Sequence, residues 1–161
     1  MAATDTTRQL HDARQLKRLR ELRERTALTA LRTAEREVRA AEDELQQRQQ
    51  LMQRLQGERD QLTQRIVHEC APQLGRLAGY ASAAQEDLDD QLERTEYALI
   101  DDEEALTEAQ QAAEAARRAW LRAVSQSGAA DTLVDDARRG LLREREARLE
   151  REDAPLPARM A

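Results

Sequence analysis

Residues 31–66 read LRTAEREVRAAEDELQQRQQLMQRLQGERDQLTQRI. Alternate steps of three and four residues through this stretch meet an apolar side chain at nine of eleven positions. The eleven positions are Leu31, Ala34, Val38, Ala41, Leu45, Arg48, Met52, Leu55, Arg59, Leu62 and Ile66. A mean spacing of about 3.5 residues keeps one stripe facing a partner helix along its whole length. The stretch therefore predicts a long coiled-coil helix.

The composition argues against a compact globular domain. The chain of 161 residues contains no Phe, one Trp and two Tyr, and 36% of its residues are charged. Much of its apolar content is Ala, which buries little surface, so a central core cannot offset the entropy cost of ordering the chain. Long helices that pair along narrow seams suit this inventory. We expect an all-α protein.

Pro72 marks the strongest break in the middle of the chain, because proline disfavours the helical conformation at the preceding residue and lacks a backbone donor. We expect one helix over residues 6–70, a turn at 71–73 and a second helix over 74–125. The second helix carries its own seam of 3–4 spacing, with one eleven-residue repeat at the step from Leu88 to Leu92 that unwinds the supercoil locally. Its positions are Leu74, Leu77, Ala81, Ala84, Leu88, Leu92, Thr95, Leu99, Asp102, Leu106, Ala109, Ala113, Ala116, Trp120 and Ala123.

Both ends of the chain depart from these two seams. Asp5, Thr6 and Thr7 supply N-cap chemistry for the first helix. The apolar residues near the start drift from the register of Leu31, which indicates a phase shift between residues 22 and 31. They are Leu10, Ala13, Leu16, Leu19 and Leu22. Residues 125–128 read SQSG and predict a second break, followed by a helix over 131–153 that either continues the arm or folds back as a third helix. Two prolines make residues 154–161 an expected disordered tail.

Two seams of similar length around one break predict an elongated antiparallel two-helix coiled-coil hairpin, with residues 1–153 as a single domain. Pairing across the turn brings together residues whose numbers add up to about 144, such as Leu45 and Leu99. The acidic stretch 86–114 would then lie along arginines of the first helix. A straight parallel dimer is the structural rival, and the break at Pro72 counts against it. We expect the protein alone to be a monomer.

No catalytic constellation, cofactor site or metal site is expected. His68, Glu69 and Cys70 are adjacent in sequence, and three consecutive residues cannot converge on one face of a helix. The protein is therefore not expected to be an enzyme. A single cysteine, a start without signal-peptide character and the absence of a long apolar run favour a cytoplasmic location without membrane insertion.

Clusters of basic residues are the main functional lead. The residues are Arg14, Lys17, Arg18, Arg20, Arg23 and Arg25 near the N-terminus, with Arg138 and Arg139 in the last expected helix. A concentrated positive end on an acidic chain can dock in an acidic pore or groove. The alternative is a solvated face that neighbouring Glu residues balance. At the opposite end, a second candidate surface consists of Val67, His68, Leu74, Leu77 and Tyr80.

Polar residues on the seams have two interpretations. Arg48, Arg59 and Asp102 either fix the register of the helices, or the arginines lay their methylenes along the seam and reach solvent with their heads, which we favour. Trp120 is interpreted as a packing residue, with a role as a partner anchor as the alternative.

Residues 16–27 read LKRLRELRERTA. With the central break, the Ala-rich return helix bearing Trp120 and the charged last helix, this start resembles type III secretion proteins of the YscO/HrpO type, relatives of flagellar FliJ. The resemblance implies a cytoplasmic stalk, peripheral to the inner-membrane secretion apparatus. Its implied partners are the hexameric secretion ATPase at the basic end, the cytoplasmic domain of the export-gate membrane protein at the turn, and export chaperones.

Two other classes of function are weighed beside this one. A generic coiled-coil scaffold or adaptor would space or tether its partners without regulating an ATPase. Nucleic-acid binding through the Arg-rich start is disfavoured by the net charge of −6 and by the scarcity of aromatic side chains for stacking on bases.

Overall fold

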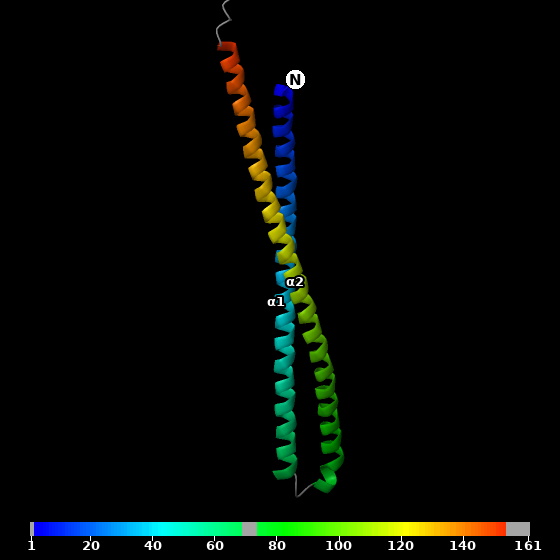
Figure 1. Ribbon diagram of the computed structural model, residues 1–161. Helices are drawn as coiled ribbons and strands as arrows, with labels where there is room; N and C mark the ends of the chain where they lie inside the picture. The colour runs from blue at the N-terminus through cyan, green and yellow to red at the C-terminus, as the bar shows by residue number, and fades with distance from the viewer. Residues whose placement is uncertain (1, 69–73, 154–161) are drawn as a thin grey trace, which may run out of the picture. The chain divides into compact units, whose positions relative to one another are not determined.

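The computed structural model describes residues 2–68 and 74–153. These residues form two helices, α1 (Ala2–His68, 67 residues) and α2 (Leu74–Asp153, 80 residues) (Figure 1). The two helices pack against each other in antiparallel directions, and the described ranges contain no strand. The expected all-α two-helix hairpin is confirmed. The expected turn 71–73, the last two residues of the first expected helix and the expected tail 154–161 lie outside the described residues.

The packing divides the chain into two compact units. Unit 1 contains the described residues 2–31 of α1 and 115–153 of α2. Unit 2 contains the described residues 32–68 of α1 and 74–114 of α2. Each helix therefore contributes one segment to each unit.

Unit 2 contains most of the seam that the apolar spacing predicts. On α1, the predicted positions from Ala34 to Ile66 are buried or half-buried, and only Arg59 among them is exposed. On α2, the predicted positions from Leu88 to Ala113 are likewise buried or half-buried. Two predicted positions nearer the start of α2, Leu77 and Ala84, are exposed instead. The stripe of apolar residues thus identifies the contact face over most of this unit.

In unit 1, the phase shift expected between residues 22 and 31 is wrong. The buried and half-buried residues of α1 continue the 3–4 spacing of unit 2 back to the start of the helix. The positions of this spacing are Thr6, Leu10, Ala13, Lys17, Arg20, Glu24, Ala27 and Leu31, and the half-buried Leu16, Glu21 and Leu28 lie next to them. Leu19 and Leu22, whose position suggested the shift, are 55% and 57% exposed. Four positions of this seam carry polar side chains, namely Thr6, Lys17, Arg20 and Glu24, so a count of apolar residues does not detect that the phase is kept.

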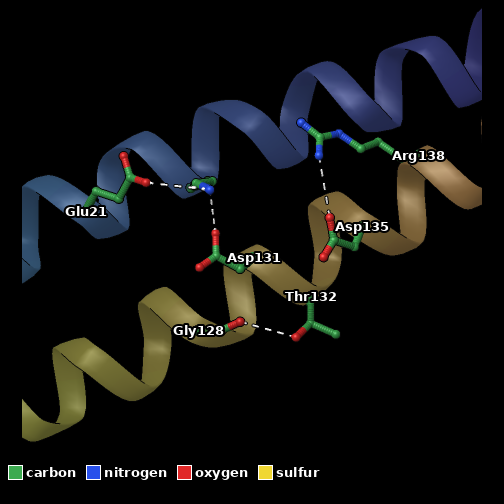
Figure 2. Close-up of polar contacts among 7 residues, drawn as sticks. Glu21, Gly128, Asp131, Thr132, Asp135 and Arg138 are labelled. Carbon is green, nitrogen blue, oxygen red and sulfur yellow. Dashed lines mark hydrogen bonds and ion pairs between the residues drawn. The ribbon is translucent and has the colours of Figure 1, made fainter.

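The break expected at residues 125–128 is also wrong, because α2 is one continuous helix over Leu74–Asp153. Ser127, Ala130 and Val134 are buried and continue the 3–4 spacing of the preceding seam. The Thr132 hydroxyl donates to the Gly128 carbonyl at 3.2 Å, one helical turn away (Figure 2). A helical glycine costs about 1 kcal/mol relative to Ala, which the burial of three consecutive seam residues offsets. Residues 131–153 thus continue α2 and do not form a third helix.

The start of α1 differs from the expected N-cap at Asp5 and Thr6. The helix begins at Ala2, and the Thr6 hydroxyl donates to the Glu144 carboxylate on α2. A side chain that contacts the opposite helix is not available to cap its own helix. Thr6 is therefore part of the seam of unit 1.

Polar contacts between the helices lie about one turn beyond the expected pairing. In unit 2, Arg59 pairs with Asp89 and Arg48 with Asp102, so the residue numbers add up to 148 and 150 rather than 144. In unit 1, the sum for Lys17 and Asp131 is 148. Part of this difference arises because helical side chains lean toward the N-terminus of their own helix. In an antiparallel pair, two residues whose side chains touch therefore lie closer to the C-terminal ends of their helices than two residues whose backbones stand directly opposite each other.

Candidate partner-binding surfaces

The two units carry opposite net charges. The described residues of unit 1 contain 16 Lys and Arg against 12 Asp and Glu, a net charge of +4. Those of unit 2 contain 9 basic against 19 acidic residues, a net charge of −10. A charge difference of this size means that each unit attracts partners of opposite charge, over a distance of about 10 Å.

All eight residues of the predicted basic site lie in unit 1, six on α1 and two on α2. Six of them are exposed, and for five of these no ion pair among the described residues involves the guanidinium group. The five are Arg14, Arg18, Arg23, Arg25 and Arg139. Arg138 is exposed as well and lies 3.6 Å from Asp135, one turn earlier on α2 (Figure 2). The exposed arginines without an ion pair are available to a negatively charged partner, whereas Arg138 already has Asp135 as a neighbour.

Lys17 and Arg20 instead take part in the contact between the two helices. The Lys17 Nζ lies 2.6 Å from Asp131 Oδ1 and 3.7 Å from Glu21 Oε1, and Figure 2 shows these two carboxylates on opposite helices. The hydrogen bond to Asp131 and the negative charge of this carboxylate raise the pKa of Lys17. Arg20 Nη1 donates to Gln126 Oε1 on α2. Sequence reasoning placed both residues on a free surface, because the phase of this seam was misread.

Trp120 occupies a seam position in unit 1 and is half-buried. Its indole nitrogen is fully shielded from solvent and has no hydrogen-bond acceptor. A buried donor without a partner costs about 1–3 kcal/mol. The interpretation of Trp120 as a packing residue fits this position, although burial of the unpaired indole N–H reduces the stability that the packing provides.

The second predicted surface, near the end of α1 and the start of α2, is described only in part. Val67, Leu77 and Tyr80 are 57%, 37% and 80% exposed, and His68 is exposed as well. The side chain of Leu74 lies outside the described set, as do Glu69 and Cys70 of the weighed metal trio. Within the described residues, no group of three His, Cys, Asp or Glu side chains could hold a metal ion.

A further exposed apolar pair lies in the middle of α2, within the acidic unit 2. Tyr97 is 63% and Ile100 is 52% exposed, and both line an open hollow on the surface of this helix. Neither residue belongs to a surface that was predicted from the sequence. The other large apolar side chains of this segment lie at seam positions. Tyr97 and Ile100 are large and apolar but lie outside the seam, and this difference could have marked them as a candidate surface.

Neither helix, over the residues described, has a stretch long and apolar enough to cross a membrane. Comparisons with models of protein families, with curated proteins and with solved structures gave no significant match. Arguments about function therefore rest on the residues and geometry of this chain.

Proposed function

We propose that this protein is a non-enzymatic stalk and regulator of a type III secretion export apparatus. In this proposal, unit 1 docks in the central pore of the hexameric secretion ATPase, and the hairpin links the ATPase to the export gate. The support consists of the resemblance of residues 16–27 to the start of the YscO/HrpO/FliJ proteins, the antiparallel two-helix fold and the basic character of unit 1.

The charge difference between the units is the observation that carries the proposal. A pore lined with carboxylates attracts unit 1, at +4, and repels unit 2, at −10. The exposed arginines Arg14, Arg18, Arg23 and Arg25 have guanidinium groups available for such carboxylates. Electrostatic complementarity of this kind raises the association rate and selects the orientation of docking.

Regulation follows from preferential binding to the assembled ring. A partner that binds the hexamer and not the free subunits shifts the assembly equilibrium toward the hexamer by mass action. One asymmetric hairpin in a pore contacts the six subunits unequally, so it can favour different conformations in different subunits. We therefore expect stimulation of ATP hydrolysis that saturates near one hairpin per hexamer.

The remaining features of the proposal concern location and further partners. The protein acts in the cytoplasm, at the inner-membrane secretion apparatus. The surface comprising Val67, His68, Leu77 and Tyr80 is proposed to bind the cytoplasmic domain of the export gate, because it is exposed and partly apolar. Export chaperones are the third proposed class of partner.

ATPase activity of the host's secretion ATPase, titrated with this protein, tests the proposal. The diagnostic variant is Arg14→Gln/Arg18→Gln/Arg23→Gln/Arg25→Gln, which removes exposed charges and leaves Lys17 and Arg20 in place. The matched control is Arg32→Gln/Arg39→Gln/Arg54→Gln/Arg65→Gln, which removes the same charge from exposed positions of unit 2. Stimulation by the wild type and by the control, but not by the diagnostic variant, is expected. Equal stimulation by both variants contradicts docking through unit 1.

A generic scaffold or adaptor is the second candidate function. Exposed large apolar residues occur in both units, including Leu19 and Leu22 in unit 1 and Tyr97 in unit 2, as expected for a protein that tethers several partners. A scaffold would bind the ATPase without changing its turnover. Binding without stimulation therefore favours this candidate over the stalk.

A further inference from the structure

Tyr97 and Ile100 form an exposed apolar pair on α2, outside both surfaces that the proposed function uses. They are three residues apart, so they are neighbours on one face of the helix. The next seam residue, Leu99, is half-buried, whereas Tyr97 and Ile100 are exposed by more than half of their surface. Single exposed apolar residues are common on proteins, so the surroundings of this pair decide its meaning.

Carboxylates flank the apolar pair along the helix. Glu93, Glu96 and Glu103 line the same open hollow of about 430 Å³ as Tyr97, Ile100 and Leu99. Residues 93, 96, 100 and 103 are spaced by three, four and three, so they follow one line along the helix over about 15 Å. Ile100 and Glu96 are the central residues of this line, Tyr97 lies next to Glu96, and Glu93 and Glu103 are at the two ends. Interfaces with an apolar centre and a charged rim have this arrangement.

The charges of these carboxylates are not compensated within the described part of the chain. Asp89 and Asp102, on the same helix, pair with Arg59 and Arg48 of α1. No ion pair within residues 2–68 and 74–153 involves Glu93, Glu96 or Glu103. Within the described residues, α1 thus forms ion pairs with Asp89 and Asp102 and leaves Glu93, Glu96 and Glu103 available to an external partner.

We infer that the surface formed by Glu93, Glu96, Tyr97, Ile100 and Glu103, the Tyr97 surface, binds a basic amphipathic helix of another protein. Such a helix presents apolar residues at i, i+3 and i+4 to cover Tyr97 and Ile100, with Lys or Arg beside them to meet the carboxylates. A nucleic acid is disfavoured by the net charge of −10 on unit 2. Aromatic residues at the centre of an interface commonly contribute most of the binding energy, so Tyr97 is the expected anchor.

Binding of a probe peptide to the full chain tests this inference. The probe is a labelled, capped peptide of about 18 residues of Leu, Ala and Lys, with leucines on one helical face. A scrambled peptide of the same composition lacks this face. Fluorescence anisotropy is measured for the wild type, for Tyr97→Ser/Ile100→Ser and for Glu93→Gln/Glu96→Gln/Glu103→Gln. The charge-matched control is Glu37→Gln/Glu42→Gln/Glu58→Gln, at exposed positions of α1 in the same unit.

The expected result is an affinity for the amphipathic peptide that falls by about tenfold or more in each of the two surface variants and by less than about twofold in the control. The scrambled peptide should bind no better to the wild type than to the surface variants. Absence of binding overturns the inference. An equal loss of affinity in the control also overturns it, because a general attraction to the negative charge of unit 2 would then explain the binding.

Self-association is the rival occupant, since Leu19 and Leu22 of unit 1 are exposed beside arginines and resemble the proposed partner in chemistry. Light scattering of the protein alone over a range of concentrations separates the two. A monomer at all concentrations supports a different protein as partner. A concentration-dependent oligomer that disappears in Tyr97→Ser/Ile100→Ser shows that a second copy occupies the surface and overturns the inference. Because the peptide assay contains no ATPase, its failure leaves the stalk function untouched.

Discussion

The Arg48 guanidinium donates from Nε to Asp102 Oδ2 at 3.0 Å, and both residues occupy seam positions on facing helices of unit 2. The side chain of Asp102 is 13% exposed and that of Arg48 is 39% exposed. Of the two interpretations of seam arginines, Arg48 fits a role in fixing register, because its charge is paired across the seam rather than directed only to solvent. Arg59 also pairs across the helices, with Asp89, but both of these side chains are exposed by more than half.

Asp102→Leu is expected to destabilise the protein by about 1–2 kcal/mol, because it leaves Arg48 half-buried without its acceptor. The double variant Arg48→Met/Asp102→Leu should regain most of this loss, since an apolar pair suits the seam. Urea unfolding followed by circular dichroism measures both. If the effects of Arg48→Met and Asp102→Leu simply add in the double variant, the pair does not couple the helices.

Gly128→Ala is expected to stabilise unit 1 by about 0.5–1 kcal/mol. Gly128 lies inside a continuous helix without a positive φ angle, and an added Cβ meets no atom within 4 Å. The gain arises from the lower backbone entropy of Ala in the unfolded chain. Gly57→Ala in unit 2 has the same open surroundings and serves as a comparison. A loss of stability in Gly128→Ala, alongside a gain in Gly57→Ala, would indicate that residues 125–128 do break the helix in solution.

Trp120→Phe is expected to leave stability unchanged or to raise it by up to about 1 kcal/mol. The substitution keeps an aromatic ring at the seam and removes an indole N–H that is buried without an acceptor. Trp120→Ala removes the ring and should cost about 2 kcal/mol or more. Thermal unfolding of the two variants separates the contribution of the aromatic ring to stability from the cost of the buried N–H. A large loss in Trp120→Phe would mean that the N–H is hydrogen-bonded in solution.

The contribution of Lys17 to stability is expected to persist at neutral pH and to disappear in strongly alkaline solution. Asp131 raises the pKa of Lys17 in the folded protein, so the charged form is favoured by folding. This contribution is complete below the unfolded pKa of about 10.4 and is lost as the pH rises through the higher folded value. The stability difference between wild type and Lys17→Met should therefore be constant from about pH 7 to 9 and shrink above it. A difference that grows with alkaline pH has the opposite sign and rules out the pairing.

Apolar spacing predicts the fold well where apolar residues mark the contact face. In unit 2, the stripe from Ala34 to Ile66 is apolar at nearly every seam position, so counting steps of three and four finds the interface. Residue pairing across the helices is harder to predict, because the lean of the side chains accounts for part of a displacement of about one turn.

In unit 1 the same method fails, since the seam itself is partly polar. Lys17, Arg20 and Glu24 occupy seam positions, whereas Leu19 and Leu22 lie outside them. Continuing the steps backward from Leu31 would have found the true phase, but only by accepting charged residues at the interface. The basic character of the candidate site could be predicted from composition alone. The engagement of Lys17 and Arg20 between the helices could not, because it depends on that phase.

Hydrogen–deuterium exchange of the protein, free and in complex with the host's secretion ATPase, tests most directly which unit docks. Amide protection reports burial and ordering along the backbone. Docking of unit 1 predicts added protection in residues 2–31 and 115–153, with little change in residues 32–68 and 74–114. Added protection confined to residues 32–68 and 74–114 would contradict docking through the basic unit.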